Sequence, residues 1–348
     1  MSEENKITIM DVARLSGLSK GTVDRVLHNR GEVSKKSYDK VMKVIKDLGY
    51  EPNLYASMLA SRKDRTIAVI IPQYAAGEYW ELIDSGIARG REFVQSFNIK
   101  VNTFFYDQYS LDSFREACAE AMESAPSGVV LAPLFRNGTS EFTAQLQEQS
   151  IPYVFIDSKL EEEGYLAYFG MPMYRSGYLC ADLLTGGGQI DEVAMVRIER
   201  DKKRQSDPTV NRRAGFMDYM LEHCPDCSFH TIFINPRDPV SIEQTLDSFA
   251  AAHPGVKHIA VFSSRVYLIV DYLEKHDCHD MKVIGYDDLS ANVAALKRGT
   301  VDFIITQHAS DQAFMAISTL NDLLVHRRNP ARRDNYMHMD ILTRYNAD

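Results

Sequence analysis

The amino-acid sequence predicts an α/β protein with a small all-helical head and a large body of two lobes. From residue 66 onward, apolar runs of strand length alternate with helical segments, which is typical of parallel sheets covered on both faces. The rhythm repeats on either side of about residue 163, which indicates two lobes. At 348 residues, the chain is also too long for one ordinary core.

The elements of the body follow from hydrophobic periodicity. The first strand is the apolar run IAVIIP at 67–72, and the first helix is expected to place Leu82, Ile83, Ile87 and Phe93 on one side. The expected strands are 66–72, 100–106, 128–132, 153–156, 192–198, 231–234, 258–262 and 282–285. The expected helices are 80–96, 110–124, 141–149, 176–184, 210–223, 241–253 and 266–276. Ligands of such sheets bind beside the carboxyl ends of the strands, so the cleft between the lobes is the expected binding site.

Composition excludes several classes of protein. Hydrophobic residues make up 45% and charged residues 25%, which is the profile of a soluble globular chain and not of a disordered or collagen-like one. No apolar run approaches the ~20 residues that span a bilayer. The N-terminal MSEENKITIM lacks the basic and apolar regions of a secretion signal, and five cysteines without such a signal indicate reduced thiols. These features predict a cytoplasmic protein.

Charge is distributed unevenly along the chain. Residues 1–65 carry 13 basic and 9 acidic side chains, a net charge of +4, whereas the remainder carries 26 and 39, a net charge of −13. A basic head on an acidic body indicates that the two parts have different partners, and a chance fluctuation of a few charges is the alternative.

The head follows the plan of a helix-turn-helix, in which the second helix fits the major groove of DNA. Helices are expected at 10–15, 20–28 and 35–48. Thr8, Ser19 and Ser34 precede them as caps of their N-termini. Val12 and Leu15 are expected on the apolar face of the first helix because they are three residues apart.

The residues of the head closely resemble those of the LacI/GalR family of bacterial transcription regulators. Residues 7–13 (ITIMDVA), 16–19 (SGLS) and 22–27 (TVDRVL) match the family forms TIxDVA, AGVS and TVSRVLN. Residues 48–53 (LGYEPN) and 56–60 (ASMLA) match its hinge segment, so that more than 50 residues agree in order and spacing. The resemblance implies a DNA-binding head, a hinge helix and a two-lobed Rossmann-like effector domain similar to periplasmic sugar-binding proteins.

This organisation divides the chain into three parts. Residues 1–51 are expected to form the helix-turn-helix domain, 52–65 the hinge helix and linker, and 66–348 the effector-binding and dimerisation domain. Lobe one is expected at about 66–162 and 308–335, and lobe two at about 163–307 and 336–348.

The resemblance also implies which residues contact DNA. Lys20, Gly21 and Arg25 occupy the positions that read base edges, although Gly21 has no side chain and offers at most a backbone or shape contact. Leu59 matches the hinge leucine that wedges into the minor groove. Phosphate contacts are implied for Thr22, Asn29 and Ser34. The full expected set is Thr8, Ser19, Lys20, Gly21, Thr22, Arg25, Asn29, Ser34, Asn53, Ala56 and Leu59.

Effector-binding residues are implied in the same way. Asp287 ends a strand where the family keeps a ligand-binding Asp, Arg212 matches the Arg of an RxxGF motif, and Gln307 matches a Gln that closes the cleft. The full expected set is Tyr79, Trp80, Asp157, Arg212, Ser264, Asp287, Asn292 (in the loop after Asp287) and Gln307. Two alternatives stay open: Trp80 as a core residue of its helix, and Asp157 as the cap of a turn.

The ligand is less well defined than the cleft. Ser263-Ser264-Arg265 stands where many relatives have Asn-Asp, and Pro172 stands where an Asp is frequent. A sugar or sugar derivative is expected, and Arg265 leaves room for a phosphate or a carboxylate.

Catalytic signatures are missing from the sequence. It contains no GxGxxG, Walker, HExxH or GxSxG motif, so neither an enzyme nor a cofactor is expected. His223, Cys224, Cys227 and His230 have metal-like spacing. This segment ends a helix at Pro225 and leads directly into a strand, so we interpret it as a local turn, with zinc or redox chemistry as the alternative. No metal is expected.

The sequence therefore predicts a sequence-specific transcription regulator, most simply a repressor, that binds near-palindromic operator DNA as a homodimer or a tetramer. A small carbohydrate effector is expected to control it, as an inducer or a corepressor. One alternative is a binding protein with a vestigial head, which the intact hinge motif disfavours. The other is an α/β enzyme, which the missing catalytic constellation disfavours.

Overall fold

The computed structural model describes residues 8–27, 33–48, 64–161, 164–198 and 209–347. The chain divides into two compact units, residues 1–63 and 64–348. Within the described ranges, no helix combines the length and the apolar character needed to cross a membrane.

The first unit contains three helices around a small apolar core. They are α1 (Ile9–Ser16), α2 (Lys20–Leu27) and α3 (Lys35–Leu48). Val12, Val23 and Val41 are fully buried, one from each helix. Thr8 caps α1 as expected, because its Oγ1 accepts the amide of Asp11 at 3.3 Å while the Asp11 carboxylate accepts the Thr8 amide at 3.0 Å.

One expectation for α1 was wrong. Leu15 is 55% exposed, whereas Val12, Ala13 and Ser16 are buried. The buried face of α1 therefore contains Val12 and Ser16, which are four residues apart, and Leu15 lies outside that face.

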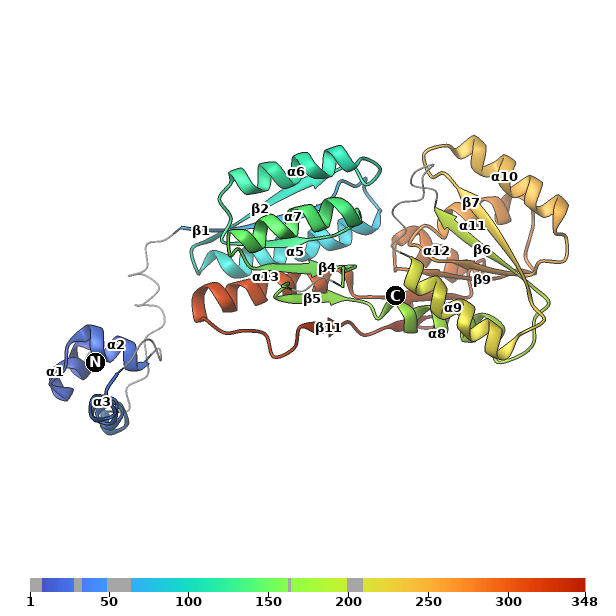
Figure 1. Ribbon diagram of the computed structural model, residues 1–348. Coiled ribbons are helices and arrows are strands. Elements are labelled where there is room, and N and C mark those ends of the chain that lie inside the picture. The colour runs from blue at the N-terminus through green and yellow to red at the C-terminus, as the bar shows by residue number, and fades with distance from the viewer. Residues whose placement is uncertain (1–7, 28–32, 49–63, 162–163, 199–208, 348) are drawn as a thin grey trace, which may run out of the picture. The chain divides into compact units, whose positions relative to one another are not determined.

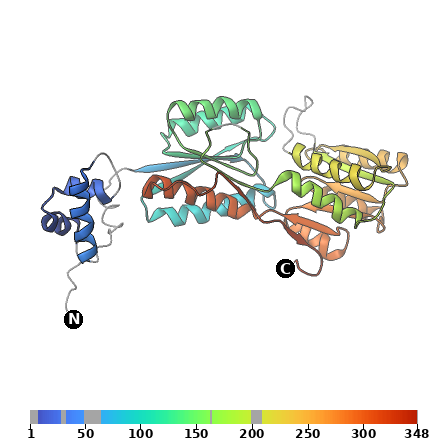
Figure 2. The same ribbon diagram turned by 60° about the horizontal axis from the view of Figure 1, so that its bottom comes forward.

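The second unit contains two six-stranded sheets, and each sheet is the centre of one lobe (Figure 1). Lobe one contains β1 (Arg65–Pro72), β2 (Ile99–Tyr106), β3 (Gly128–Leu131), β4 (Tyr153–Ile156), β5 (Ala167–Gly170) and β11 (Asp334–Tyr336). Its helices are α5 (Tyr79–Gln95), α6 (Leu111–Glu123), α7 (Arg136–Glu148) and α13 (Ala309–His326). Helices α6 and α7 cover one face of the sheet, and α5 and α13 cover the other (Figures 1 and 2).

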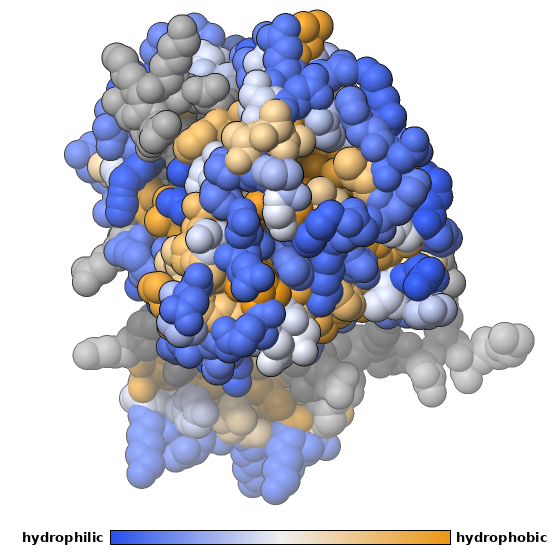
Figure 3. Space-filling view, turned by 90° about the vertical axis from the view of Figure 1, so that its right-hand side faces the viewer, coloured by the Kyte–Doolittle hydropathy of each residue, from blue (hydrophilic) through white to orange (hydrophobic). Residues whose placement is uncertain are grey.

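Lobe two repeats this plan. Its strands are β6 (Glu192–Ile198), β7 (Ser228–Ile234), β8 (His258–Val261), β9 (Lys282–Tyr286), β10 (Phe303–Thr306) and β12 (Asp340–Leu342). Its helices are α8 (Met173–Thr185), α9 (Val210–His223), α10 (Pro239–Ala252), α11 (Tyr267–Lys275) and α12 (Ser290–Arg298). The outer end of this lobe presents mostly hydrophilic residues, with apolar side chains in groups between them (Figure 3).

The two sheets have matching strand orders, β11-β5-β4-β3-β1-β2 and β12-β10-β9-β8-β6-β7. All pairs are parallel except β10 with β12. The chain passes between the lobes three times: from β5 to α8, from β10 to α13 and from β11 to β12. These parallel sheets confirm the expected α/β architecture.

The first crossing lies later than the expected boundary near residue 162. β5 pairs with β4 and β11, so lobe one continues to Gly170. β5 has only four residues, and so short a strand gives little periodic signal.

Other elements were also missed or misplaced. The expected alternation stops at residue 285 and omits α12, β10, α13, β11 and β12. β11 and β12 have three residues each, whereas α13 has 18 and carried a readable helical pattern. Helix α7 begins at Arg136 and not at residue 141, and its first turn includes Gly138, which packs closely against Leu111 and Phe114.

The core of lobe two consists of two apolar layers, one on each face of its sheet. Along β6, Val193 and Met195 pack with α8 and α9, whereas Ala194 and Val196 pack with α10, α11 and α12. This alternation is what a strand covered on both faces requires, since successive side chains point to opposite sides.

Two glycines let α8 and α9 pack backbone against backbone. A Cβ at Gly177 would lie 1.6 Å from the Arg212 carbonyl oxygen, and a Cβ at Gly215 would lie 1.9 Å from the Tyr174 carbonyl oxygen. Larger residues at these positions would push the helices apart and displace Arg212, which lies in the first turn of α9.

We therefore expect Gly177→Ala to destabilise the protein by about 2 kcal/mol or more, because the clash involves backbone atoms that cannot rotate away. Urea unfolding measures this effect. Gly188→Ala is the matched control, since its Cβ would meet nothing closer than 3.6 Å. Equal stability of the two variants would contradict the proposed role of Gly177.

Candidate functional site

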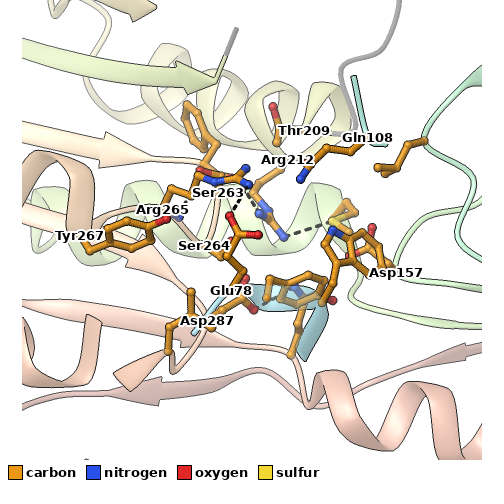
Figure 4. A pocket seen from close by; sticks show the side chains of 17 residues that line it. Glu78, Gln108, Asp157, Thr209, Arg212, Ser263, Ser264, Arg265, Tyr267 and Asp287 are labelled. Atoms are coloured by element: carbon orange, nitrogen blue, oxygen red, sulfur yellow. Dashed lines mark hydrogen bonds and ion pairs between the residues drawn. The ribbon is translucent and has the colours of Figure 1, made fainter. Parts of the chain in front are cut away.

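A cavity of about 70 Å³ lies between the lobes of the second unit. Side chains from both lobes surround it (Figure 4). Seven of the expected effector-binding residues line it: Tyr79, Trp80, Asp157, Arg212, Ser264, Asp287 and Gln307. The other lining residues are Glu78, Gln108, Leu134, Met173, Thr209, Phe262, Ser263, Arg265, Tyr267 and Leu289.

Two aspartates occupy equivalent places at the facing ends of the two sheets. Asp157 follows β4 of lobe one, and Asp287 follows β9 of lobe two. Both have left-handed backbones, with φ of 65° and 66°. The amide of Asp157 donates to the Phe169 carbonyl at 3.1 Å, and that of Asp287 donates to the Ile305 carbonyl at 3.0 Å. Asp tolerates this conformation better than most residues, so the same sharp turn directs both strand ends into the cleft.

Burial changes the ionisation of Asp287, which is 3% exposed. Loss of hydration raises its pKa to about 7, and the charge of Asp157 adds to the rise. Arg212 and a hydrogen bond from Gln307 Nε2, at 2.9 Å, act in the opposite direction. Asp287 therefore exchanges a proton near neutral pH while the cavity contains no ligand.

Arg212 is held in place by lobe two. It is 4% exposed, its Nη1 donates to the Phe262 carbonyl at 2.6 Å and its Nε donates to Ser176 Oγ at 3.3 Å. The guanidinium also stacks on the Tyr286 ring, 3.7 Å from its centre. Nη2 meets the sulfur atoms of Met171 and Met173, which are weak acceptors. That edge of the guanidinium suits a stronger acceptor from a ligand.

The aromatic pair Tyr79 and Trp80 lies at the start of α5. Trp80 is 5% exposed, packs in the core of lobe one and also lines the cavity, so both interpretations of this residue describe part of its position. Its ring meets that of Tyr79 edge to face at 5.1 Å. Burial, with the nearby charges of Asp157 and Asp287, raises the pKa of Tyr79 well above its usual value, so its hydroxyl stays protonated.

Gln108 is a lining residue that the sequence did not single out. Its Oε1 is buried and, among the described residues, has no hydrogen-bond partner, and the same is true of Gln307 Oε1. Buried polar atoms nearly always find a partner, so these two acceptors indicate where ligand hydroxyls would donate. Gln108 lies just beyond the carboxyl end of β2, and the strand-end rule could have identified it.

Asn292 is a correction. It was expected in a loop of the effector site, but it lies in the first turn of α12, is fully buried and does not line the cavity. Its Nδ2 lies within hydrogen-bonding distance of the Ser264, Tyr286 and Asp287 carbonyls, and its Oδ1 accepts the Tyr267 amide at 3.2 Å. Asn292 therefore fixes the backbone of residues that line the cavity, without lining it itself.

Two ion pairs join the lobes beside the cavity. Arg265 Nη2 lies 3.2 Å from Glu78 Oε1, and the Arg265 side chain is only 9% exposed. Arg237 Nη2 meets both carboxylate oxygens of Asp107 at 2.9 and 3.0 Å. In each pair, the cation comes from lobe two and the carboxylate from lobe one.

A third connection passes through Gln312 of α13, which is fully buried. Its Oε1 accepts the Asp157 amide at 2.9 Å, and its Nε2 donates to the Gln307 carbonyl at 3.0 Å. Because Gln307 also donates to Asp287, one chain of hydrogen bonds joins the two aspartate turns.

The cysteine segment does not assemble as a metal site. The buried Cys224 thiol donates to the Gly188 carbonyl at 3.4 Å, and burial raises the pKa of Cys227 to about 11. His223 contacts Tyr219, whereas His230 contacts Glu192 and His253. This separation supports the interpretation as a turn.

In the first unit, α2 carries the expected base-reading residues on its exposed side. Ser19, Lys20, Gly21 and Arg25 are exposed, and Thr22 is half-buried. Ser19 Oγ accepts the Thr22 amide and caps α2, and Ser34 Oγ likewise accepts the Ser37 amide at the start of α3. Arg25 Nε donates to the Gly21 carbonyl at 3.2 Å. Asn29, Asn53, Ala56 and Leu59 lie outside the described residues.

Comparison with known families identifies both units. The model described as "Bacterial regulatory proteins, lacI family" matches residues 8–53, and "Periplasmic binding protein domain" matches residues 67–328. A solved structure from Bacteroides fragilis, assigned to the LacI transcriptional regulators, is 36% identical, with a TM-score of 0.77, and the match covers 82% of this chain and 98% of that one. The chain belongs to the LacI family.

Two further comparisons show how much of this chain resembles other proteins, and how closely. The HTH-type transcriptional regulator DegA of Bacillus subtilis is 36% identical over 102 residues, which cover 29% of this chain and only 30% of DegA. A carbohydrate transporter solute binding protein from Agrobacterium radiobacter, solved with D-arabinose, is 16% identical, with a TM-score of 0.70 over 82% of this chain and 96% of that one. At that identity the likeness establishes the fold alone.

The raised pKa of Asp287 predicts how the stability of the ligand-free LacI-family protein depends on pH. The folded-state pKa of about 7 lies above the unfolded value of 3.8, so the native state binds more protons between these values. The contribution of Asp287 to the free energy of unfolding is therefore lost progressively as pH rises from about 4 to 7. Asp287→Asn removes this charge.

We expect the Asn variant to gain stability over wild type by up to a few kcal/mol between pH 4.5 and pH 8, as measured by urea unfolding. Asp288→Asn is the control, because Asp288 is exposed. A stability difference between Asp287→Asn and wild type that is the same at both pH values would contradict the burial argument.

Proposed function

We propose that this protein is a transcriptional repressor that binds a near-palindromic operator through two heads of a homodimer and releases it when a sugar enters the cleft. The buried set Asp157, Arg212, Asp287 and Gln307, shared between two lobes, is the observation that carries the proposal. The relatives are transcription regulators, and the cavity offers binding groups without a catalytic motif. Its operator would place the protein in the bacterial cytoplasm.

The chemistry of the cavity supports a hydroxyl-rich ligand. Carboxylates and amide oxygens accept hydrogen bonds from hydroxyls, a guanidinium donates to them, and aromatic rings pack on sugar faces. Among the structural neighbours, a solute binding protein of the same fold was solved with D-arabinose. A monosaccharide or a derivative of similar size is the class that we infer.

The charges favour a neutral sugar over a phosphorylated one. Arg265 already pairs with Glu78 across the cleft, and Arg212 lies with Asp157 and Asp287. A ligand anion would compete with Glu78 for Arg265 and would lie close to the carboxylates of Asp157 and Asp287, whereas a neutral polyol leaves the Arg265–Glu78 pair intact.

Control of DNA binding follows from where the ligand groups originate. Arg212 and Asp287 belong to lobe two, whereas Tyr79 and Asp157 belong to lobe one, whose strand β1 follows the segment 52–65 in sequence. A ligand that bridges the lobes favours one relative orientation of them. We infer that this orientation sets the separation of the two hinge segments in a dimer, in which Asn53, Ala56 and Leu59 are assigned to the DNA contact.

The first experiment tests effector coupling. Gel-shift titration on DNA upstream of the gene, with a panel of neutral and acidic sugars, identifies the effector. Asp287→Ala is then expected to abolish the response, a coupling of about 1–3 kcal/mol, while operator affinity without effector stays unchanged. Asp288→Ala, next to it but exposed, should respond like wild type. A folded, dimeric Asp287→Ala that loses DNA binding would show that this residue is structural and the cleft misplaced.

The second experiment tests base reading by α2. Arg25→Ala should cost about 1–3 kcal/mol at the operator and relax the preference at the base that it contacts. Arg25→Lys keeps the charge and loses the forked geometry, so it should retain affinity for unrelated DNA without recovering the preference. Binding selections on randomised half-sites measure both quantities. An unchanged base preference in both variants would remove Arg25 from the reading set.

A further inference from the structure

A second polar cluster lies in lobe two, away from the cavity lining. It consists of Glu192 at the start of β6, His230 in β7 and His253 immediately after α10. His230 Nε2 lies 3.0 Å from Glu192 Oε2, and the His230 and His253 rings are tilted by 36° with their centres 3.9 Å apart. One oxygen and two imidazole nitrogens lie within 4.8 Å of one another.

These donors match the ligand set of a zinc ion. Two histidines and a glutamate form a recurring three-residue zinc set, with ligand distances of about 2.0–2.2 Å and the fourth position left to water. In a tetrahedron of that size the ligand atoms lie roughly 3.3 Å apart. The Glu192–His230 separation of 3.0 Å is close to this value, and the widest separation needs to shrink by no more than about 1.5 Å.

The surroundings hold the carboxylate in place and keep the cluster accessible. A Cβ at Gly255 would lie 2.7 Å from Glu192 Oε1, so the absence of a side chain at Gly255 leaves the space that the Glu192 carboxylate fills. The side chains of Glu192 and His230 are 33% and 20% exposed, which leaves a path for an ion. The Phe249 ring packs against both His230 and His253 and limits their movement.

We propose that Glu192, His230 and His253 bind one Zn²⁺ ion. His230 belongs to the segment whose spacing suggested a metal, but the structure pairs it with Glu192 and His253 and not with the thiols of Cys224 and Cys227. The ion ties β6, the edge strand β7 and the end of α10 together, and it stabilises lobe two because it binds the folded site and not the separated ligands.

Titration of the full-length, tag-free protein with ZnCl₂ tests the proposal. We expect one equivalent per chain by isothermal titration calorimetry, a melting temperature that rises with zinc concentration, and an affinity that falls in acid because protons compete with zinc for the ligand atoms. His253→Gln and Glu192→Gln should each weaken zinc binding at least tenfold. Removing a residue that merely supports a metal ligand already costs about tenfold or more in metal affinity, and these variants remove a ligand itself.

Two controls separate this site from other binding. His279→Gln removes an exposed histidine of the same lobe and should leave binding unchanged, as should Cys224→Ser with Cys227→Ser. Substitution with Co²⁺ should give a spectrum without a thiolate charge-transfer band. Zinc binding that survives in folded His253→Gln and Glu192→Gln proteins, or that is lost in the cysteine variant, would overturn the proposal. Absence of binding by the folded wild type at micromolar zinc would overturn it as well.

Discussion

The second unit is organised around two carboxylates that face each other from the ends of two parallel sheets. Asp157 and Asp287 leave their strands through the same left-handed turn, and both are buried between the lobes. Burying like charges together is costly. Arg212 beside them and the raised pKa of Asp287, which allows this carboxyl to bind a proton near neutral pH, reduce that cost. A ligand whose hydroxyls donate hydrogen bonds to these carboxylate oxygens would offset the same energetic cost of burial. Ligand recognition would therefore also favour the arrangement of the lobes that buries both aspartates.

The ion pairs between the lobes differ in what they contribute. Arg237 is half exposed where it meets Asp107, and a pair of this kind contributes little because solvent screens it. Arg265 is nearly buried against Glu78, so separating the lobes without hydrating it would leave an uncompensated charge. Of the two ion pairs, Arg265–Glu78 would therefore oppose separation of the lobes more strongly.

Local patterns predicted the alternating strands and helices, and a family resemblance predicted Asp287, Arg212 and Gln307 as cleft residues that the structure brings to one cavity. Sequence reasoning failed where a residue's role depends on what meets it from far along the chain. Asn292 has the polarity of a ligand group, yet its amide is fully used by backbone groups of its own lobe. Glu78 was not among the expected site residues, because its partner Arg265 is distant in sequence. His230 of the cysteine segment is a similar case. Its neighbours Glu192 and His253 lie far from it in sequence, and the fold brings them together.

The duplicated architecture explains how a small ligand bound in the cleft can act beyond the residues that it contacts. Each lobe is a rigid layered core, whereas three chain crossings, the two ion pairs and the Gln312 link connect them. A rearrangement therefore concentrates at the connections, since packed cores do not deform continuously. Gln312 lies on α13, which packs on α5 of lobe one, and it also holds the turn of Asp157 and the backbone of Gln307. Any motion that carries Asp287 and Gln307 with lobe two must break or follow that link. The buried amide of Gln312 thus joins ligand recognition in lobe two to the helices of the lobe whose first strand follows the hinge segment in sequence.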